Sequence, residues 1–279
     1  MGDEVRGGRQ DRLGHPLTSP SEYTEVLARN RALTIVAMVG LMVVAWAYTA
    51  YLAVDVRSAS MRSMVAAAGA PASMAWRPSD VTFMLVMWSV MMVAMMLPSA
   101  TPMILLFERV GRRREAEGRP RTSVAVFVAG YIVAWLGFSA VATFANWGLH
   151  QAGLLTTMMG RTTPMVAGFV LIAAGVFQWT PLKEACLTHC RSPLAFLTMH
   201  WREGAGGALR MGLHHGLYCV GCCWLLMALL FVLGVMNLAW IAALTVVVLL
   251  EKLSPGGEWW SRVSGASLVL WGLAVGTGL

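Results

Sequence analysis

One short stretch, HHGLYCVGCCW from His214 to Trp224, holds three of the five cysteines of this 279-residue chain. On an α-helix, residues three, four, seven or eight positions apart share one face. Four residues have this spacing: His215, Cys219, Cys222 and Cys223. A helix would therefore present one imidazole and three thiols along a single stripe. Thiolate and imidazole together are ligands for copper(I) or zinc.

The stripe cannot form a complete metal site alone. A helix places His215 and Cys223 about 12 Å apart along its axis, too far for both to bind one tetrahedral ion through bonds of ~2.0–2.3 Å. The segment KEACLTHCRSP offers a partner, because its Cys186, His189 and Cys190 also share one helical face. We therefore expect all five cysteines, with His189 and His215, to lie on two neighbouring faces that bind a metal ion.

Packing is the alternative role for each thiol, because cysteine is a common small buried residue. Metal or thiol chemistry is favoured because every cysteine falls on a face that also carries a histidine. Disulfides are disfavoured, because the distribution of basic residues predicts that both segments lie toward the cytoplasm, where thiols stay reduced. The paired CxxC motifs of zinc ribbons are absent. His200 and His214 lie nearby in the sequence, although His214 points away from the stripe.

An earlier apolar stretch is rich in methionine. One helical face carries Met84, Met87, Met91 and Met95, and an adjacent row carries Met92, Met96 and Met103. Methionine often simply fills gaps in a core. Its thioether is also a soft neutral ligand that favours copper(I) over zinc and binds weakly enough for release. Two pairs, Met91/Met95 and Met92/Met96, locally resemble the MxxxM arrangement of high-affinity copper uptake channels. We therefore place the Met91–Met96 rows in a predicted copper(I) path, with Met91 and Met95 as its ligands.

Pro98 and Pro102 interrupt the hydrogen-bond ladder of the same stretch. Such breaks are tolerated in a membrane where other groups satisfy the freed carbonyls, and Ser99 and Thr101 are expected to contribute. A kinked helix beside a helix that carries ligands is typical of a binding site between spans.

Two further pairs have mainly structural interpretations. Gly212 and Gly216 form a GxxxG motif that would let another helix approach the His215 region closely. Glu251 and Lys252 end a later apolar run and are interpreted as anchors at the membrane boundary.

Composition places these faces in a membrane. The chain is 57% apolar and only 13% charged, against about 25% charge for a soluble domain. Apolar runs of roughly 17–25 residues cross a ~30 Å hydrocarbon core. Seven runs qualify: Leu33–Val54, Val81–Phe107, Val124–Leu149, Pro164–Thr180, Met211–Leu233, Val235–Leu250 and Val263–Leu279. We predict an all-α, polytopic transmembrane bundle of about seven spans.

Basic residues give the orientation. With the N-terminus inside, 17 of the 21 Lys and Arg residues fall on inner segments, as the positive-inside rule requires. The N-terminus is therefore predicted to be cytoplasmic, and the net charge of +7 reflects topology rather than a nucleic-acid partner. Residues 1–30 mix Gly, Pro, Ser and charge, which predicts a disordered cytoplasmic tail before one transmembrane domain at 31–279.

Several segments resemble a bacterial family labelled predicted metal-binding integral membrane protein. They include WTPLKEACLTHCRSPLAFL, GLHHGLYCVGCCWLLM and AMMLPSATPM, and the similarity covers roughly residues 80–275. The resemblance implies a multi-pass protein of the bacterial cytoplasmic membrane. It also implies that the signature positions are Cys186, Cys190, His215, Cys219, Cys222 and Cys223. It assigns no position to His189 or His214.

The leading hypothesis is a membrane protein that binds a soft metal ion, with copper(I) favoured over zinc. It would hand the ion across or within the membrane, with a metallochaperone or a membrane enzyme as partner. One alternative is a membrane thiol oxidoreductase that exchanges electrons between a quinone and cysteine pairs such as Cys186–Cys190 or Cys219–Cys222. Another is an accessory or assembly subunit of a metal-containing membrane enzyme. An enzymatic role is less favoured, because the chain has no nucleophile elbow, phosphate loop or HExxH motif.

Overall fold

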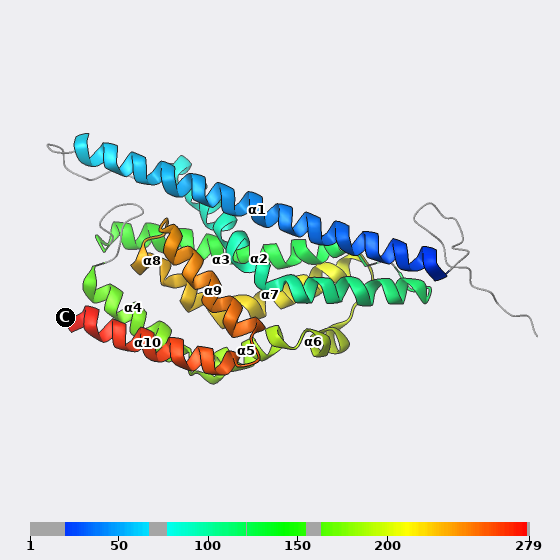
Figure 1. Cartoon of the computed structure of the whole chain (residues 1–279). Helices are drawn as coiled ribbons and strands as arrows, with labels where there is room; N and C mark the ends of the chain where they lie inside the picture. The colour runs from blue at the N-terminus through cyan, green and yellow to red at the C-terminus, as the bar shows by residue number, and fades with distance from the viewer. Residues whose placement is uncertain (1–19, 67–76, 121, 155–162, 278–279) are drawn as a thin grey trace, which may run out of the picture.

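The computed structural model describes residues 20–66, 77–120, 122–154 and 163–277, and in these ranges the chain forms ten helices and no strand. They are α1 Pro20–Ala66, α2 Pro78–Ala116, α3 Val124–Gln151, α4 Pro164–Phe177, α5 Pro181–Arg191, α6 Pro193–His200, α7 Gly204–Ala228, α8 Leu230–Leu233, α9 Leu238–Leu253 and α10 Gly257–Thr277. The long helices form an elongated bundle, with α1 along one side (Figure 1). The all-α prediction is confirmed for these residues.

The predicted tail and the observed helices overlap. Helix α1 already begins at Pro20, so residues 20–30 of the predicted tail are helical. Residues 1–19 lie outside the described residues.

Four stretches are long and apolar enough to cross a membrane: Arg31–Asp55, Pro78–Ala116, Val124–Gln151 and Gly204–Leu233. The pair α4 and α5 passes the same test jointly and is bent by 62°, which raises the number of candidate spans to five. Helix α9 has only 16 residues. By length and composition the structure thus supports four or five membrane-spanning elements, where the sequence alone predicts seven.

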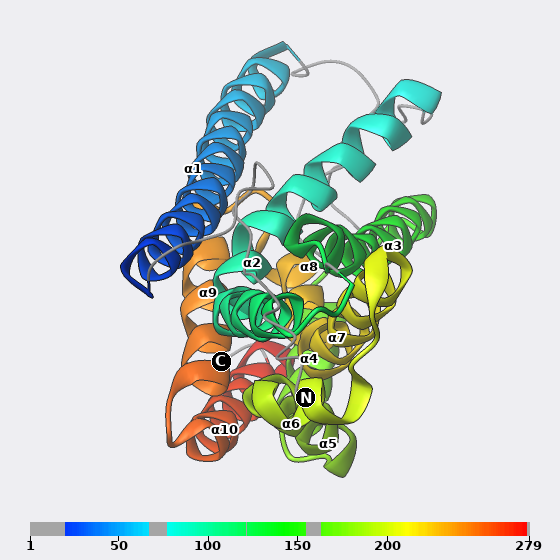
Figure 2. The ribbon, with the colours of Figure 1, turned by 90° about the vertical axis from the view of Figure 1, so that its right-hand side faces the viewer.

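Helix α2 contains both prolines and changes direction along its length (Figures 1 and 2). Pro98 has no N–H to offer the carbonyl of Ala94, and the indole Nε1 of Trp46 in α1 donates to that oxygen instead, at 3.0 Å. Ser99 Oγ donates to Met96 O at 2.9 Å, and Thr101 Oγ1 donates to a carbonyl one turn back at 3.2 Å. The freed carbonyl of Ala94 is therefore satisfied by a neighbouring helix, a contribution from α1 that the sequence did not indicate. Ser99 and Thr101 do not take the predicted part, because they donate to the carbonyls of Met96 and Leu97, which the prolines do not free.

Helices α3 and α7 pack at very short range. A Cβ atom on Gly212 would overlap the carbonyl oxygen of Phe127, and one on Gly216 would come within 2.7 Å of Ala134 Cβ. Gly130 of α3 makes the same kind of close contact from the other helix, because a Cβ atom there would overlap the backbone of Leu209. The GxxxG motif therefore does bring another helix close to the His215 region, and that helix is α3.

The break between α4 and α5 sets the direction of the second cysteine segment. Helix α4 ends at Phe177, and α5 begins at Pro181, whose fixed φ suits the first helical position. The side chain of Thr180 caps α5 by accepting from Lys183 N at 3.3 Å. After the 62° bend, α5 lies against α7.

Candidate metal centre

Helix α7 holds the predicted stripe on its inner side. His215 is 3% exposed, and the three cysteines of the stripe, Cys219, Cys222 and Cys223, are each 1% exposed. The helical spacing therefore predicts the shared face correctly. None of these side chains faces outward from the bundle.

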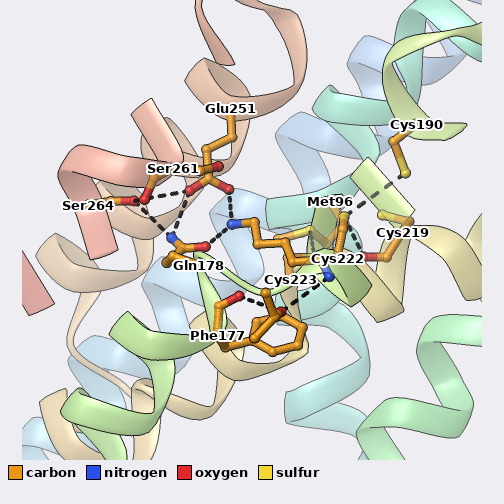
Figure 3. A network of polar contacts seen from close by, with 12 residues as sticks. Met96, Phe177, Gln178, Cys190, Cys219, Cys222, Cys223, Glu251, Ser261 and Ser264 are labelled. Carbon is orange, nitrogen blue, oxygen red and sulfur yellow. Dashed lines mark hydrogen bonds and ion pairs between the residues drawn. The ribbon is translucent and has the colours of Figure 1, made fainter. Parts of the chain in front are cut away.

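Helix α5 brings the other two cysteines to this face. Cys190 Sγ lies 4.0 Å from Cys222 Sγ, although the two residues are 32 positions apart (Figure 3). Cys186 contacts α7 at Gly221, where a Cβ atom would come within 2.9 Å of its sulfur. All five cysteines are free thiols. The junction of α5 and α7 is thus the place where thiols from two helices meet, and we call the group of five the sulfur cluster.

The Cys190–Cys222 distance suits a shared soft ion. Bonds of about 2.3 Å would place two sulfurs about 3.8 Å apart at a tetrahedral angle and about 4.6 Å apart on opposite sides of an ion. The observed 4.0 Å lies between these limits. Two thiols can therefore grip one ion with small side-chain adjustments.

A larger ligand set does not converge. Within the described ranges, no group of three or more His, Cys, Asp or Glu side chains is arranged to hold a metal ion. The sulfur cluster therefore does not form the closed four-ligand site typical of structural zinc.

Cys219 has two polar neighbours that the sequence interpretation missed. Tyr131 of α3 places its hydroxyl 3.0 Å from Cys219 Sγ and donates to Met96 O at 3.1 Å. Lys252 of α9 donates to Cys219 Sγ at 2.9 Å and to Ser99 Oγ at 3.3 Å.

The boundary-anchor interpretation of Glu251 and Lys252 is wrong for the described structure. Both side chains are buried inside the bundle, Glu251 at 2% and Lys252 at 6% exposure. The sequence places them at the end of an apolar run, where anchoring is common, but it does not show that the end of α9 packs against other helices.

The methionine row lies in the core of the bundle. Met91 and Met95, the two predicted ligands, are fully buried. Met96 of the adjacent row is the methionine that reaches the sulfur cluster, because its Sδ lies 3.9 Å from Cys223 Sγ (Figure 3). Met96 therefore connects the methionine rows to the cysteines, whereas the predicted ligands were Met91 and Met95.

The histidines have different surroundings. The ring of His189 stacks on Tyr218 with centroids 4.1 Å apart, and its Nδ1 lies 2.8 Å from Ala185 O. The ring of His215 stacks against Tyr131 at 5.9 Å. Its Nδ1 is buried with no hydrogen-bond partner in the described part of the chain. This nitrogen lies on the same helical face as the buried thiols, and it could therefore serve as a metal ligand without breaking a hydrogen bond seen in the described residues.

A cavity of about 240 Å³ opens beside this region. It is lined by His200, Arg202, Arg210, Met211, Leu213, His214 and Leu217. The rings of His200 and His214 meet edge to face at 4.9 Å, and His214 lies 4.8 Å from Tyr218. Aromatic and imidazole rings thus connect the cavity with Tyr218 and His189.

A second buried polar group, which includes Gln178, Glu251 and Ser264, lies apart from the cysteines (Figure 3). Lys183 and Glu251 form an ion pair at 2.7 Å, with side chains 1% and 2% exposed. Gln178 donates to Glu251 Oε1 and to Ser264 Oγ, both at 2.8 Å, and accepts from Lys183 Nζ. The group joins the α4–α5 break to α9 and α10, and nothing in the sequence pattern indicated it.

The structure thus defines a class, a helical protein with several helices able to span a membrane and five cysteines gathered where two helices meet, three of them buried and two partly exposed. The family PpoB2, described as "Copper chaperone", matches residues 85–275, and the chain belongs to this family. Membership gives the protein a copper-related role and agrees with the metal-related resemblance of its motifs. No curated protein and no solved structure matches the chain.

Proposed function

We propose that this protein is an integral membrane copper(I)-delivery protein whose sulfur cluster carries the ion. The observation that supports it best is the 4.0 Å approach of Cys190 and Cys222 from two different helices. Thiolates are soft ligands that select copper(I), and the family is described as a copper chaperone. Copper(I) is the cargo, handed on to a metallochaperone or a copper-requiring membrane enzyme.

The cysteines and histidines divide into two stages. Cys186 and Cys190 on α5, with His189, form a docking stage on the cytoplasmic side. Cys219, Cys222 and Cys223 with His215 form the intramembrane stage, which shares Cys190 through its contact with Cys222. Loading therefore proceeds by exchange of sulfur ligands between the two helices.

The methionine row provides a weaker path away from the cysteines. Cys223 lies 3.9 Å from Met96, and Met91 and Met95 continue along α2 inside the core. Thioethers hold copper(I) less strongly than thiolates, so an ion can leave along them.

The membrane arrangement is part of the proposal. Seven spans with a cytoplasmic N-terminus account for the distribution of basic residues. In this arrangement α9 and α10 cross as the sixth and seventh spans, the protein lies in the bacterial cytoplasmic membrane, and residues 1–30 precede a single transmembrane domain.

Metal analysis of the purified full-length protein tests the proposal. After loading with copper(I) under reducing conditions, wild type is expected to retain copper, and the triple variant Cys219/Cys222/Cys223→Ser is expected to lose it. Metal binding displaces thiol protons, so retention should also fall when the sample is acidified.

The single variant Cys186→Ser is the matched control. It removes a thiol outside the Cys190–Cys222 pair, so loading should slow while the final copper content stays close to that of wild type. A full copper load on the triple variant would rule out the intramembrane stage.

A thiol oxidoreductase is the second candidate function. The pairs expected from the sequence are Cys186–Cys190 and Cys219–Cys222, and the 4.0 Å contact favours Cys190–Cys222 instead. Oxidation would join Cys190 and Cys222 and pass two electrons and two protons to a quinone, which becomes a quinol. Counting free thiols after quinone treatment, with metal chelated, separates the functions. A reversible Cys190–Cys222 disulfide that cycles with quinone would favour the oxidoreductase.

A further inference from the structure

The cavity of about 240 Å³ beside α7 is lined by two arginines, Arg202 and Arg210, and by no Asp or Glu among the described residues. Neither arginine forms an ion pair with another described residue. The adjacent carboxylate of Glu203 is used elsewhere, because it lies 2.9 Å from the guanidinium of Arg114. The cavity therefore carries positive charge that the described part of the protein does not balance.

Backbone contacts bring the two arginines to the same cavity. The chain turns at Gly204, whose φ is +75°, and the segment before it folds back along α7. The N–H of Arg202 donates to Met211 Sδ at 3.3 Å, and a Cβ atom on Gly207 would come within 2.6 Å of the Arg202 carbonyl group. Arg202 is thus fixed beside the turn of α7 that follows Arg210.

The face of α7 that lines the cavity changes from charged to apolar along the helix. Arg210, His214 and Leu217 are four and then three positions apart, so they share one side of α7, and all three line the cavity. Seven residues of helix place Leu217 about 10 Å beyond Arg210 along the axis. Leu217 is 55% exposed and belongs to the stretch Gly204–Leu233, which is long and apolar enough to cross a membrane. This order of groups matches a lipid, whose charged head group is followed by apolar chains.

A metal ion suits the cavity less well than an anion does. The rings of His200 and His214 meet edge to face at 4.9 Å, but the two guanidinium charges repel a cation. No third His, Cys, Asp or Glu in the described ranges completes a metal site with them. Guanidinium groups bind phosphate through paired hydrogen bonds, and an imidazole N–H can donate to a phosphate oxygen.

We propose that this cavity binds the head group of an anionic phospholipid. Arg202 and Arg210 hold the phosphate, and Leu213 and Leu217 contact the start of the acyl chains. Basic pockets at the cytoplasmic ends of spans are suited to such head groups. The volume of about 240 Å³ is below the roughly 300–1,000 Å³ of pockets that enclose a whole small molecule, which fits a head group whose chains stay outside. The inference rests on the membrane arrangement in the proposed function, but not on copper(I) binding.

Native mass spectrometry of the full-length protein in detergent tests the inference. The protein is titrated with phosphatidylglycerol, which is anionic, and with phosphatidylcholine of the same acyl chains, which is zwitterionic. Wild type is expected to retain one phosphatidylglycerol at least about tenfold more tightly than phosphatidylcholine, and the double variant Arg202→Gln/Arg210→Gln is expected to lose most of this preference.

The double variant Arg109→Gln/Arg113→Gln is the matched control. It removes the same charge from two exposed positions of α2 that do not line the cavity. Its preference for phosphatidylglycerol should stay within about twofold of wild type. A preference that survives loss of Arg202 and Arg210, or one that falls equally in the control, overturns the proposed site.

Two measurements on wild type do not depend on how the variants fold. Added salt should lower the preference for phosphatidylglycerol, because it screens exposed charges, and equal retention of the two lipids at low salt overturns the proposal. Excess inorganic phosphate should leave the lipid bound, and full displacement would assign the cavity to a free anion instead. Copper(I) retention measured on the same samples tests the proposed function separately, since its loss with the lipid preference intact overturns copper delivery alone.

Discussion

Cys219 illustrates how much of the candidate site depends on single contacts. Its sulfur lies 3.0 Å from the neutral hydroxyl of Tyr131 and 2.9 Å from the ammonium of Lys252. The two neighbours differ in charge, and the neutral one should contribute to stability rather than to metal binding.

Tyr131→Phe tests this difference. The substitution removes the hydroxyl that contacts both Cys219 Sγ and Met96 O, so the free energy of unfolding should fall by about 1–2 kcal/mol. In the proposed function, copper(I) retention should stay close to that of wild type, because the proposed ligand side chains on α7 are unchanged. Denaturant unfolding and metal analysis measure the two quantities, and loss of copper from the variant would mean that the hydroxyl of Tyr131 takes part in holding the ion.

At the scale of residues, the sequence predicted the helical face but not its neighbours. The spacing from His215 to Cys223 fixes which side chains share a face, because helical geometry is local. Lys252 and Tyr131 reach Cys219 through tertiary packing that spacing does not encode. The sulfur contact of Met96 could have been anticipated from the second methionine row, but sequence alone cannot choose between two adjacent rows.

At the scale of elements, the α3–α7 contact positions both Tyr131 and the cysteines of α7. Its short range depends on glycine, since a Cβ atom on Gly212 would overlap the carbonyl oxygen of Phe127. Any side chain there must push the two helices apart.

Gly212→Ala should therefore lower the free energy of unfolding by about 1–3 kcal/mol, as overpacking does. Gly137→Ala on α3 is the matched control, because nothing lies within 4 Å of a Cβ atom at that position. Removing a flexible glycine from a helix should stabilise the protein by about 0.5–1 kcal/mol. Denaturant unfolding in detergent measures both changes. Equal effects in the two variants would mean that the close packing contributes no stability.

The elements themselves were partly predictable. The GxxxG motif and the prolines of α2 act through local backbone geometry, so their effects follow from sequence. The 62° bend between α4 and α5 does not, because the run Pro164–Thr180 reads as an ordinary span. The polar group of Lys183 and Glu251 at this bend joins residues 68 positions apart, a separation that no periodicity reveals.

At the scale of the whole molecule, the proposed function makes the side from which copper(I) enters depend on the arrangement of the helices in the membrane. Helix α3 is one of the stretches able to cross a membrane, and it separates the turn at Gly118 from the turn at Gly153. The positive-inside rule predicts Gly118 inside and Gly153 outside.

Topology reporters inserted after each glycine test this arrangement. A reporter after Gly118 should behave as cytoplasmic and one after Gly153 as external, because six basic residues flank the first site in the segment 108–123. Neither position has a neighbour within 4 Å of a Cβ atom, so insertion should disturb packing little. Both reporters on one side would show that α3 does not cross, and exchanged sides would reverse the proposed orientation.

Composition was sufficient to predict an all-α fold with several helices long and apolar enough to cross a membrane, because long apolar runs leave few other folds. The number of spans is harder to predict, since the apolar runs of the sequence include α9 and α10, while neither helix is among those long and apolar enough to cross a membrane. Helix α9 has only 16 residues. The buried side chains of Glu251 and Lys252 attach the end of α9 to neighbouring helices. A hydropathy pattern instead places a membrane boundary at these two charged residues.

Glu251 and Lys252 are consecutive residues whose side chains are held by different helices. Glu251 contacts α5 through Lys183 and α10 through Ser264, and Lys252 contacts α7 through Cys219. In the proposed function, an ion that displaces the thiol of Cys219 would also displace Lys252, and the shared backbone would pass that movement to Glu251 and the helices it contacts.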